Sequence, residues 1–527
     1  MSMFPLPRAA RVLFATASLV LLAACATLPP RGEPPTSNAF TDTAQSRIGR
    51  AATRLAAPHA GLTGARALID AREAFVARAL LAQGAEHSID VQTYIWHADT
   101  SGSLLAQALW EAAERGVRVR VLLDDANTTG MDETIAALDA HPSIEVRLFN
   151  PFANRTWRLA DFATDFGRVN RRMHNKSFTV DNQATVVGGR NIGDEYLGAE
   201  TSVAFTDLDV LAIGPVVQQV SSEFDRYWNS APAWPAATLL APPAASALED
   251  TRRFWAAHHG SPKAMAYLEA VRRQPLLASM TAGTLEFDWV PARVISDAPE
   301  KVLLPVHRRD VHLAPRLHEA FGQAERELVL VSPYFVPGEE ATASLVAMAA
   351  RGVRVTVLTN SLAATDVTAV YAGYQRYRRE LLRGGVHLYE LKPAAIPPRS
   401  REDDDERRGG MGGSQGGSSS ASLHAKTFAV DRARIFIGSF NLDPRSVALN
   451  TEMGVVLESA AFARQLSDVA RDVFPRDAYE LRLEGENVVW IEHTPAGEVR
   501  HATTPGVGLL RNLWVGFLSL LPIESLL

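Results

Sequence analysis

Two stretches of the chain, residues 173–191 and 423–441, carry the same reactive side chains at the same spacing. In each, a His is followed two residues later by Lys, five further on by Asp, seven further on by Gly and three after that by Asn. The matched positions are His174, Lys176, Asp181, Gly188 and Asn191 in one stretch and His424, Lys426, Asp431, Gly438 and Asn441 in the other. A single His-x-Lys arises easily by chance, whereas five matched positions that occur twice indicate a functional pair.

Apolar residues flank the Asp in each stretch, which predicts a strand, a turn near the Asp and a second strand. Because side chains alternate along a strand, His174 and Lys176 face the same way, as do His424 and Lys426. Two His and two Lys that meet at one point suit attack on a phosphodiester. One imidazole can be the nucleophile and the other the general acid and base, while the ammonium and amide groups hold the phosphate oxygens.

The repeated pattern resembles the H-x-K-x4-D-x6-G-S-x-N signature of the phospholipase D superfamily, here in two copies. The resemblance extends from about residue 65 to residue 460. The segments 164–181, 205–217 and 441–454 are similar to those of bacterial cardiolipin synthases, the C type in particular. This resemblance implies an α/β fold of two duplicated sandwich lobes with the active site at their interface. It also implies a mechanism that uses neither a metal ion nor a cofactor.

The resemblance further implies roles for single residues. It assigns catalysis to the two His, Lys and Asp sets, phosphate binding to Asn191, Ser439 and Asn441, and orientation of the imidazoles to Asp207, Asp209 and Glu452. Asp181 and Asp431 are expected to hold loops through hydrogen bonds rather than to touch substrate. Which acid serves which His stays open. His174 is expected to be the nucleophile, with His424 as acid and base.

The first copy departs from the signature, because it has Gly189 where the second copy has Ser439. A hydroxyl group is therefore present on one side only. The two halves are expected to differ in function.

Duplication reaches beyond the two motifs. The sequence Arg-Gly-Val-Arg-Val occurs at 115–119 and again at 351–355. Around it, helices are predicted at 103–117 and 341–353 and strands at 89–96, 117–125, 328–336 and 353–361, after a helical pattern at 64–81. Alternating strands and helices in both halves favour an α/β sandwich in each.

The N-terminus has the order of an export signal, with Arg8 and Arg11 before an apolar run from Val12 to Ala24. The sequence Leu-Ala-Ala-Cys ending at Cys25 resembles a bacterial lipobox, whose Cys is lipidated; an uncleaved anchor or a chance Cys is the alternative. Cys25 is the only cysteine, so no disulfide forms. We expect a lipid-anchored protein of the bacterial envelope that faces the periplasm.

The predicted organisation is a signal and lipobox at 1–25, a tether at 26–60, a first lobe at 61–240, a linker at 241–275, a second lobe at 276–480 and a C-terminal extension at 481–527. The Gly- and Ser-rich segment 401–420 is either a mobile lid or an insertion without a role. The apolar tail 509–527 either lies in a membrane interface or packs on the body. Asp124 and Asp125 look like a metal pair in isolation, but solvated or structural carboxylates are favoured.

The predicted function is transfer of a phosphatidyl group through a phosphohistidine, which the resemblance extends to cardiolipin formation. The implied partners are phosphatidylglycerol as acceptor, phosphatidylethanolamine or phosphatidylglycerol as donor, and a membrane surface; an accessory protein stays unknown. A hydrolytic phospholipase D that releases phosphatidic acid shares every catalytic residue. A nuclease of the same superfamily is disfavoured by the net charge of −6, and a silent scaffold by the six intact His, Lys and Asp positions.

Overall fold

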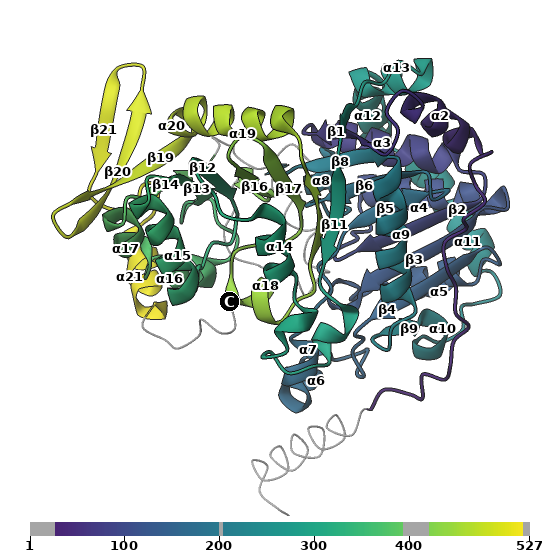
Figure 1. Cartoon of the computed structure of the whole chain (residues 1–527). Coiled ribbons are helices and arrows are strands. Elements are labelled where there is room, and N and C mark those ends of the chain that lie inside the picture. The colour runs from purple at the N-terminus through teal and green to yellow at the C-terminus, as the bar shows by residue number, and fades with distance from the viewer. Residues whose placement is uncertain (1–26, 200–203, 394–420, 520–527) are drawn as a thin grey trace, which may run out of the picture.

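The computed structural model describes residues 27–199, 204–393 and 421–519. It forms two α/β lobes that lie side by side, the first to the right and the second to the left in Figure 1. The predicted signal with Cys25 and the segment 401–420 fall outside the described residues. Each lobe is organised around one large mixed sheet, as the alternation of strands and helices predicts.

The first sheet has nine strands. In spatial order they are β10 (Asp288–Val290), β1 (Thr63–Leu68), β8 (Asp209–Ile213), β6 (Ala184–Gly188), β5 (Ser177–Val180), β2 (Ser88–Thr93), β3 (Arg118–Asp124), β4 (Ile144–Phe149) and β9 (Ala233–Pro235). Strands β2, β3 and β4 run parallel, and β5 joins them antiparallel to β2.

The second sheet has ten strands. In spatial order they are β11 (Ala292–Ser296), β18 (Met453–Leu457), β17 (Arg434–Gly438), β16 (Lys426–Val430), β12 (Glu327–Val331), β13 (Arg354–Asn360), β14 (His387–Leu391), β19 (Ala478–Glu484), β20 (Asn487–Thr494) and β21 (Gly497–His501). Its central order from β18 to β14 repeats the order from β8 to β4 in the first sheet, so the duplication seen in the sequence is a duplication of topology.

Helices surround these sheets (Figure 1). In the first half of the chain they are α2 (Arg47–Ala56), α3 (Ala71–Gly84), α4 (Thr100–Glu114), α5 (Asp132–Asp139), α6 (Leu159–Thr164), α7 (Phe166–Val169), α8 (Asp194–Leu197), α9 (Pro215–Trp228), α10 (Ala236–Leu239), α11 (Ala247–His259), α12 (Pro262–Arg272) and α13 (Pro275–Ala282). In the second half they are α14 (Leu313–Phe321), α15 (Gly338–Ala350), α16 (Thr368–Tyr374), α17 (Arg378–Arg383), α18 (Pro444–Ala448), α19 (Ala460–Asp472), α20 (Phe474–Asp477) and α21 (Leu509–Leu518).

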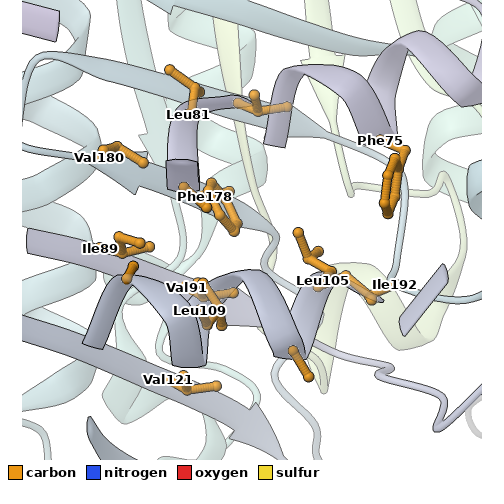
Figure 2. Close-up of a cluster of buried hydrophobic side chains, with 14 of the residues drawn as sticks. Phe75, Leu81, Ile89, Val91, Leu105, Leu109, Val121, Phe178, Val180 and Ile192 are labelled. Atoms are coloured by element: carbon orange, nitrogen blue, oxygen red, sulfur yellow. The ribbon is translucent and has the colours of Figure 1, made fainter. Parts of the chain in front are cut away.

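The core of the first lobe lies between the central strands and helices α3 and α4 (Figure 2). Figure 2 shows Leu109 beside Val91 and Leu105 beside Ile192, and Phe75 and Phe178 belong to the same buried cluster. All of these side chains are buried, and burial of each contributes roughly 1.5–3 kcal/mol. This packing fixes strand β5, which directly follows Lys176 in the first motif, beside its neighbour β2.

A further core joins the two lobes. Val187 and Val210 of the first sheet belong to the same buried cluster as Ile437 and Val455 of the second. Helix α9 adds Val217 to this cluster. The lobes therefore share apolar surface and form one body around the site between them.

The two motif Asp residues hold their hairpins as expected. Asp181 accepts hydrogen bonds from the backbone N–H groups of Glu86, His87 and Ser88, the last two at 2.8 and 3.0 Å. Asp431 accepts equivalent bonds from Arg326 and its two neighbours. Each Asp also begins a turn in which it and the next residue have positive φ, the conformation of a type I′ hairpin turn.

Several predicted elements match closely. Helices α4 and α15 confirm the helices expected at 103–117 and 341–353, each beginning and ending three residues earlier. The expected helical pattern at 64–81 is wrong in its first part. There the chain forms strand β1, because it pairs with β8 on one side and β10 on the other, and α3 begins only after its N-cap Asp70.

The lobe boundary lies later than the sequence suggested. Strand β10 belongs to the first sheet and β11 to the second, so the chain crosses between the lobes near residue 291 rather than 276. Helices α12 and α13 pack on α3 of the first lobe. Strands β19 to β21, expected in a separate extension, continue the second sheet.

The segment 28–40 is not a free tether where the structure describes it. Arg31 donates to the carbonyls of Ser230 and Ala233, both at 2.8 Å. The N–H of Ala39 donates to Asp225, and Arg118 lies over the ring of Phe40. The polar backbone of this segment therefore finds partners along the surface of the first lobe.

Gly438 allows two strands of the second lobe to approach closely. A Cβ atom there would lie 2.4 Å from the carbonyl oxygen of Met453 and 2.6 Å from the Cα of Gly454. Both obstacles are backbone atoms of the adjacent strand β18, so the sheet would have to shift.

We therefore expect Gly438→Ala to lower the free energy of unfolding by about 1–3 kcal/mol, the usual effect of overpacking. Urea denaturation followed by circular dichroism measures the change. Gly516→Ala is the control, because a Cβ at this helical position meets no atom within 4 Å. The control should leave stability unchanged or raise it by less than about 1 kcal/mol. Equal stability of the two variants would contradict the tight approach.

Candidate active site

The candidate catalytic side chains lie at the start of the central hairpin in each lobe. Lys176 directly precedes strand β5, and Lys426 is the first residue of β16. His174 and His424 are each 8% exposed, and both Lys side chains are buried. Each His and Lys pair therefore lies in a site that is nearly closed to solvent.

The backbone of each catalytic His is bound by the opposite lobe. The N–H of His174 donates to the carbonyl of Thr451 at 2.8 Å, and the N–H of His424 donates to the carbonyl of Thr206 at 2.9 Å. Around the second contact, strand β15 (Ala421–Leu423) pairs in parallel with β7 (Ala204–Thr206). The two motifs therefore meet through main-chain hydrogen bonds.

The side chain of each catalytic His is likewise bound by an acid from the opposite lobe. Nδ1 of His174 lies 2.9 Å from Glu452, and Nδ1 of His424 lies 2.5 Å from Asp207. Since Nδ1–H donates to the carboxylate, each Nε2 is left with its lone pair for a proton or a phosphorus atom. The acids expected to orient the imidazoles therefore act across the lobe interface.

Each acid is itself held in place. The N–H of Leu208 donates to Asp207 at 2.8 Å. The N–H of Glu452 donates to the buried Asp297 at 2.7 Å, and the hydroxyl of Ser439 donates to the Glu452 carboxylate. The imidazoles are therefore positioned by acids that have little freedom to move.

This geometry explains why the first motif has Gly where the second has Ser. A Cβ on Gly189 would lie 2.2 Å from Oδ1 of Asp207, so no larger residue fits beside that acid. In the second motif the acid is the longer Glu452, and Ser439 bonds to it. Ser439 was expected to bind phosphate; in this structure its hydroxyl is used to position Glu452 instead.

Asp209 was expected as one of the acids that orient a catalytic His, but in the structure it does not bond to either imidazole. Its carboxylate accepts a hydrogen bond from Arg78 at 2.9 Å and another from the N–H of Arg190 at 3.1 Å. Asp209 is fully buried, and these partners neutralise its charge. It supports the strand that precedes Asn191 rather than an imidazole.

The two Lys ammonium groups face the site with donors to spare. Nζ of Lys176 donates to the carbonyl of His174 at 2.6 Å, and Lys426 makes the same bond to the carbonyl of His424. An ammonium carries three N–H donors, so each retains two for phosphate oxygens. Burial lowers the pKa of Lys176 to about 7 and that of Lys426 to about 8.

Two Asn side chains complete the set that could hold phosphate. Oδ1 of Asn191 accepts from the N–H of Ile95 at 3.3 Å. Nδ2 of Asn191 is buried and makes no hydrogen bond of normal geometry within the described part of the chain. Oδ1 of Asn441 is also buried without such a bond, but it is an acceptor, so only the Nδ2 donors of Asn441 could hold a phosphate oxygen. Buried polar atoms of this kind are rare away from functional sites.

Protonation differs between the two His and acid pairs. Burial, together with the charge of Lys426, lowers the pKa of His424 to about 4. Burial also lowers the pKa of His174 well below its usual value. Burial acts to raise the pKa of Asp207, but the charges of His424 and Lys426 outweigh this effect, so that the pKa of Asp207 is lowered. Burial raises the pKa of Glu452 to about 7. The His424 pair thus carries the more strongly ionised acid.

Three Tyr residues that the sequence analysis did not single out lie around the catalytic pair. Tyr94 contacts the ring of His174 edge to face at 5.0 Å, and Tyr196 contacts His424 in the same way at 5.1 Å. Tyr334 donates to Asp366 at 2.8 Å. No repeated spacing marks these residues, because Tyr94 and Tyr334 lie in loops and Tyr196 lies in the short helix α8.

Asp124 and Asn360 occupy equivalent places at the ends of β3 and β13. Asp124 accepts from the N–H of Met173 at 2.7 Å, and Asn360 exchanges two hydrogen bonds with Leu423. Each therefore fixes the residue just before a catalytic His. Asp124 and Asn360 follow the two Arg-Gly-Val-Arg-Val repeats at the same distance, so the repeat could have identified them from the sequence.

Asp125 is a structural carboxylate, as the sequence analysis favoured. It pairs with Arg155 at 2.6 Å and accepts from the N–H of Phe152 at 2.8 Å. In the described part of the chain, the group spaced to hold a metal ion is His97, Asp99 and Glu195. His97 and Glu195 already pair at 3.2 Å, and none of the three contacts a catalytic His, so we assign no metal to this group.

Two equivalent lobes with a shared His and Lys site define a protein with a pair of phospholipase D-like domains. A comparison with protein families gives the same result: residues 80–228 and 317–473 match the cardiolipin synthase, PLD-like domain. The chain belongs to this family, and it is a phosphatidyltransferase of the phospholipase D type.

Individual relatives agree with this assignment. The chain is 44% identical to cardiolipin synthase C of Escherichia coli (strain K12), over 91% of this chain and 100% of that protein. It is 27% identical to cardiolipin synthase A of Pseudomonas syringae, over 79% and 71% of the two chains. The crystal structure of phosphatidylserine synthase from Haemophilus influenzae matches with a TM-score of 0.55 at 13% identity, over 90% of this chain and 100% of that chain, which supports the fold.

The lowered pKa values of the two Lys predict a loss of activity in mild alkali. A neutral amine cannot hold an anionic phosphodiester, so kcat/KM should fall as pH rises through about 7 to 8. Steady-state rates between pH 5.5 and 9.5 measure this fall. In Lys176→Arg, whose guanidinium keeps its charge, any remaining fall should follow Lys426 at about pH 8. A flat profile up to pH 9.5 would show that neither ammonium titrates in this range.

Proposed function

We propose that the chain forms cardiolipin by moving a phosphatidyl group from a donor phospholipid to phosphatidylglycerol through a covalent phosphohistidine. The observation that carries this proposal is the exchange of acids between the lobes, which orients the imidazoles of both motifs through Nδ1 and leaves both Nε2 atoms for the reaction. Family membership supports the choice of phospholipids as substrates.

In the first step, Nε2 of His174 attacks phosphorus in the donor lipid. The bond from phosphorus to the head-group oxygen breaks, and His424, which must enter this step as an imidazolium paired with Asp207, gives its Nε2 proton to that oxygen. In the second step, His424 takes the proton from a hydroxyl of phosphatidylglycerol, whose oxygen attacks the phosphohistidine. The phosphorus–nitrogen bond breaks, which frees His174 and yields cardiolipin.

The difference between the two acids supports this division of roles. A residue that carries a proton between steps benefits from a fully ionised partner, and Asp207 lies 2.5 Å from His424. Glu452, whose pKa is raised to about 7, still fixes the ring of His174 for attack. Lys176, Lys426, Asn191 and Asn441 would share the phosphate oxygens.

Hydrolysis is the second candidate, since water and a lipid alcohol use the same intermediate. Burial of both imidazoles to 8% exposure favours transfer, because little room is left for bulk water around the bond that reacts. The donor is proposed to be phosphatidylethanolamine or phosphatidylglycerol. A nuclease role would need a basic groove, and the net charge of −6 gives it no support.

We further propose that the protein is held at the bacterial envelope by a lipid on Cys25 and faces the periplasm. The lipobox-like sequence and the lack of any other Cys support this location. Among the described residues, no helix combines the length and apolarity needed to cross a bilayer.

Replacing either catalytic His by Asn should lower kcat by roughly ten-thousand-fold, because neither imidazole can take over the role of the other. Mass spectrometry of products from defined phospholipids measures turnover and separates cardiolipin from phosphatidic acid. His141→Asn is a matched control, because His141 is 7% exposed and packs on Trp110 outside the site.

The same variants test the assignment of the nucleophile. After an acid-free quench, labelled donor should leave a covalent label on the parent and none on His174→Asn. A label that persists in His174→Asn and disappears in His424→Asn would reverse the two roles. If phosphatidic acid were the sole product, the protein would be a hydrolase and not a transferase.

Cys25→Ala should block lipidation and leave the precursor uncleaved. Metabolic labelling with a fatty-acid analogue, together with the size of the protein on a gel, measures both effects in cells. Unchanged processing and labelling of the variant would rule out the anchor.

A further inference from the structure

We propose that Lys301 and Asp297 are positioning residues for the acid behind His174: together they clamp the backbone of Glu452 and balance its negative charge. Neither residue belongs to a repeated motif, and both lie between β11 and α14 in the second lobe. The inference rests on the proposed function, in which His174 is the nucleophile and Glu452 accepts its Nδ1 proton in a hydrogen bond.

Asp297 is bound to Glu452 in both directions. The N–H of Asp297 donates to the carbonyl of Glu452 at 2.9 Å, and the N–H of Glu452 donates to the Asp297 carboxylate at 2.7 Å. The other oxygen of that carboxylate accepts from the N–H of Leu313, the first residue of α14, at 2.5 Å. Both acids are fully buried, so no solvent competes for these bonds. The main chain of the acid that orients His174 is therefore fixed.

Lys301 supplies positive charge to this pair of acids. Its ammonium lies 3.0 Å from the Asp297 carboxylate and donates to the carbonyl of Ser446 at 3.0 Å. Lys301 is buried, and a buried ammonium is costly unless a carboxylate neutralises it. Burial raises the pKa of Glu452 to about 7, and the charges of Lys176 and Lys301 act in the opposite direction. The ionisation of Glu452 therefore depends on Lys301.

The first lobe also has a buried cation behind its acid, but the cation comes from a different element. There Arg190 donates to the carbonyl of Asp207 at 2.6 Å. Arg190 lies between the Gly pair and Asn191 of the first motif, and the second motif has Phe440 at the same position. Phe440 is buried and carries no charge. Lys301 therefore takes the electrostatic place of Arg190 on the side of Glu452.

An insertion in the second lobe makes room for this arrangement. Strands β1 and β11 take equivalent places beside β8 and β18. Residues 69 and 70 connect β1 to α3, whereas residues 297–312 connect β11 to α14. Asp70 caps α3 and is exposed. In the longer connection Asp297 is buried, and Lys301 follows in the short 3-10 helix Pro299–Val302.

The insertion is attached to the first lobe as well. The hydroxyl of Tyr227 in α9 donates to the carbonyl of Asp297 at 2.9 Å, and Arg171 donates to the carbonyl of Lys301 at 3.2 Å. Arg171 lies three residues before His174. The positioning pair is therefore bound to the lobe that carries the imidazole it serves.

The charge balance matters when His174 is phosphorylated. Attack through Nε2 forms the phosphorus–nitrogen bond as the bond to the head-group oxygen breaks, while the His174 proton stays on Nδ1. The ring thereby becomes positively charged, and an ionised Glu452 stabilises it better than a protonated one. Lys301 therefore keeps the site active at a lower pH than burial of Glu452 would otherwise allow.

Ionisable groups from several elements act on Glu452, so the test changes one charge and leaves the others. These groups are the ammonium groups of Lys176, Lys301 and Lys426, the carboxylates of Asp297 and Asp443, and the imidazole of His174. Beside Lys301, burial together with that ammonium lowers the pKa of His312 to about 4, so His312 stays neutral above pH 6.

Carbethoxylation by diethyl pyrocarbonate, followed at each His by peptide mass spectrometry between pH 6 and 9, tests the proposal. The full chain is used without any lipid. A neutral imidazole attacks this reagent and becomes a charged ring, so the reaction at His174 should require an ionised Glu452. His424 is the internal control in every sample, because its acid Asp207 lies in the first lobe and is backed by Arg190.

Two variants remove the charge: Lys301→Met, and Lys301→Gln, whose amide can still donate to Asp297 and Ser446. In both, the pH of half-maximal reaction at His174 should rise by at least about 0.5 unit, because loss of a nearby cation raises the pKa of Glu452. At pH 6.5 the rate at His174 should fall roughly three- to tenfold, while the rate at His424 stays within about twofold of the parent. In turnover at this pH, kcat should fall with KM unchanged, since Lys301 lies behind Glu452 and touches no substrate.

Glu390→Gln is the matched control. Glu390 and Arg378 form another buried ion pair of the second lobe, at 3.2 Å. Loss of this charge should lower the melting temperature and leave the pH profiles of both catalytic His unchanged.

A parent-like profile at His174 in both Lys301 variants would overturn the proposal, and so would an equal shift at His174 and His424. A shift with Met but not with Gln would show that Lys301 acts by hydrogen bonding alone, which contradicts the charge balance. Failure of the parent to form cardiolipin would count against the proposed function only, because the reagent reports on His174 without turnover.

Discussion

The hydrogen bond from each catalytic imidazole to a carboxylate of the other lobe is the constraint on which this structure depends. Neither His174 nor His424 has its orienting acid in its own lobe, so a lobe by itself cannot prepare its imidazole. A buried carboxylate without its partner would lower the stability of the protein by several kcal/mol. The hydrogen bonds within the site and the apolar core shared by the lobes therefore favour the same arrangement of the two lobes. The site is therefore complete only when both lobes are in contact.

The duplication supplies two similar halves, and small differences make them unequal. Gly189 makes room for the short Asp207, while Ser439 supports the longer Glu452. One acid is ionised and lies very close to its His, and the other has its pKa raised by burial to about 7. A symmetric fold can thus hold a proton-carrying imidazole on one side and a nucleophile on the other.

The sequence by itself determined the candidate catalytic residues, the duplicated α/β lobes and the apolar character of α21, because each depends on residue type and on spacing along one segment. Strand alternation places His174 beside Lys176, and the positive φ of Asp181 and Asn182 is local turn chemistry. Only the tertiary structure decided that Asp207 serves His424, that Asp209 pairs with Arg78, and that residues 63–68 form a strand. Those outcomes depend on which distant segments become neighbours, and spacing within one segment carries no information about the partner that packs against it.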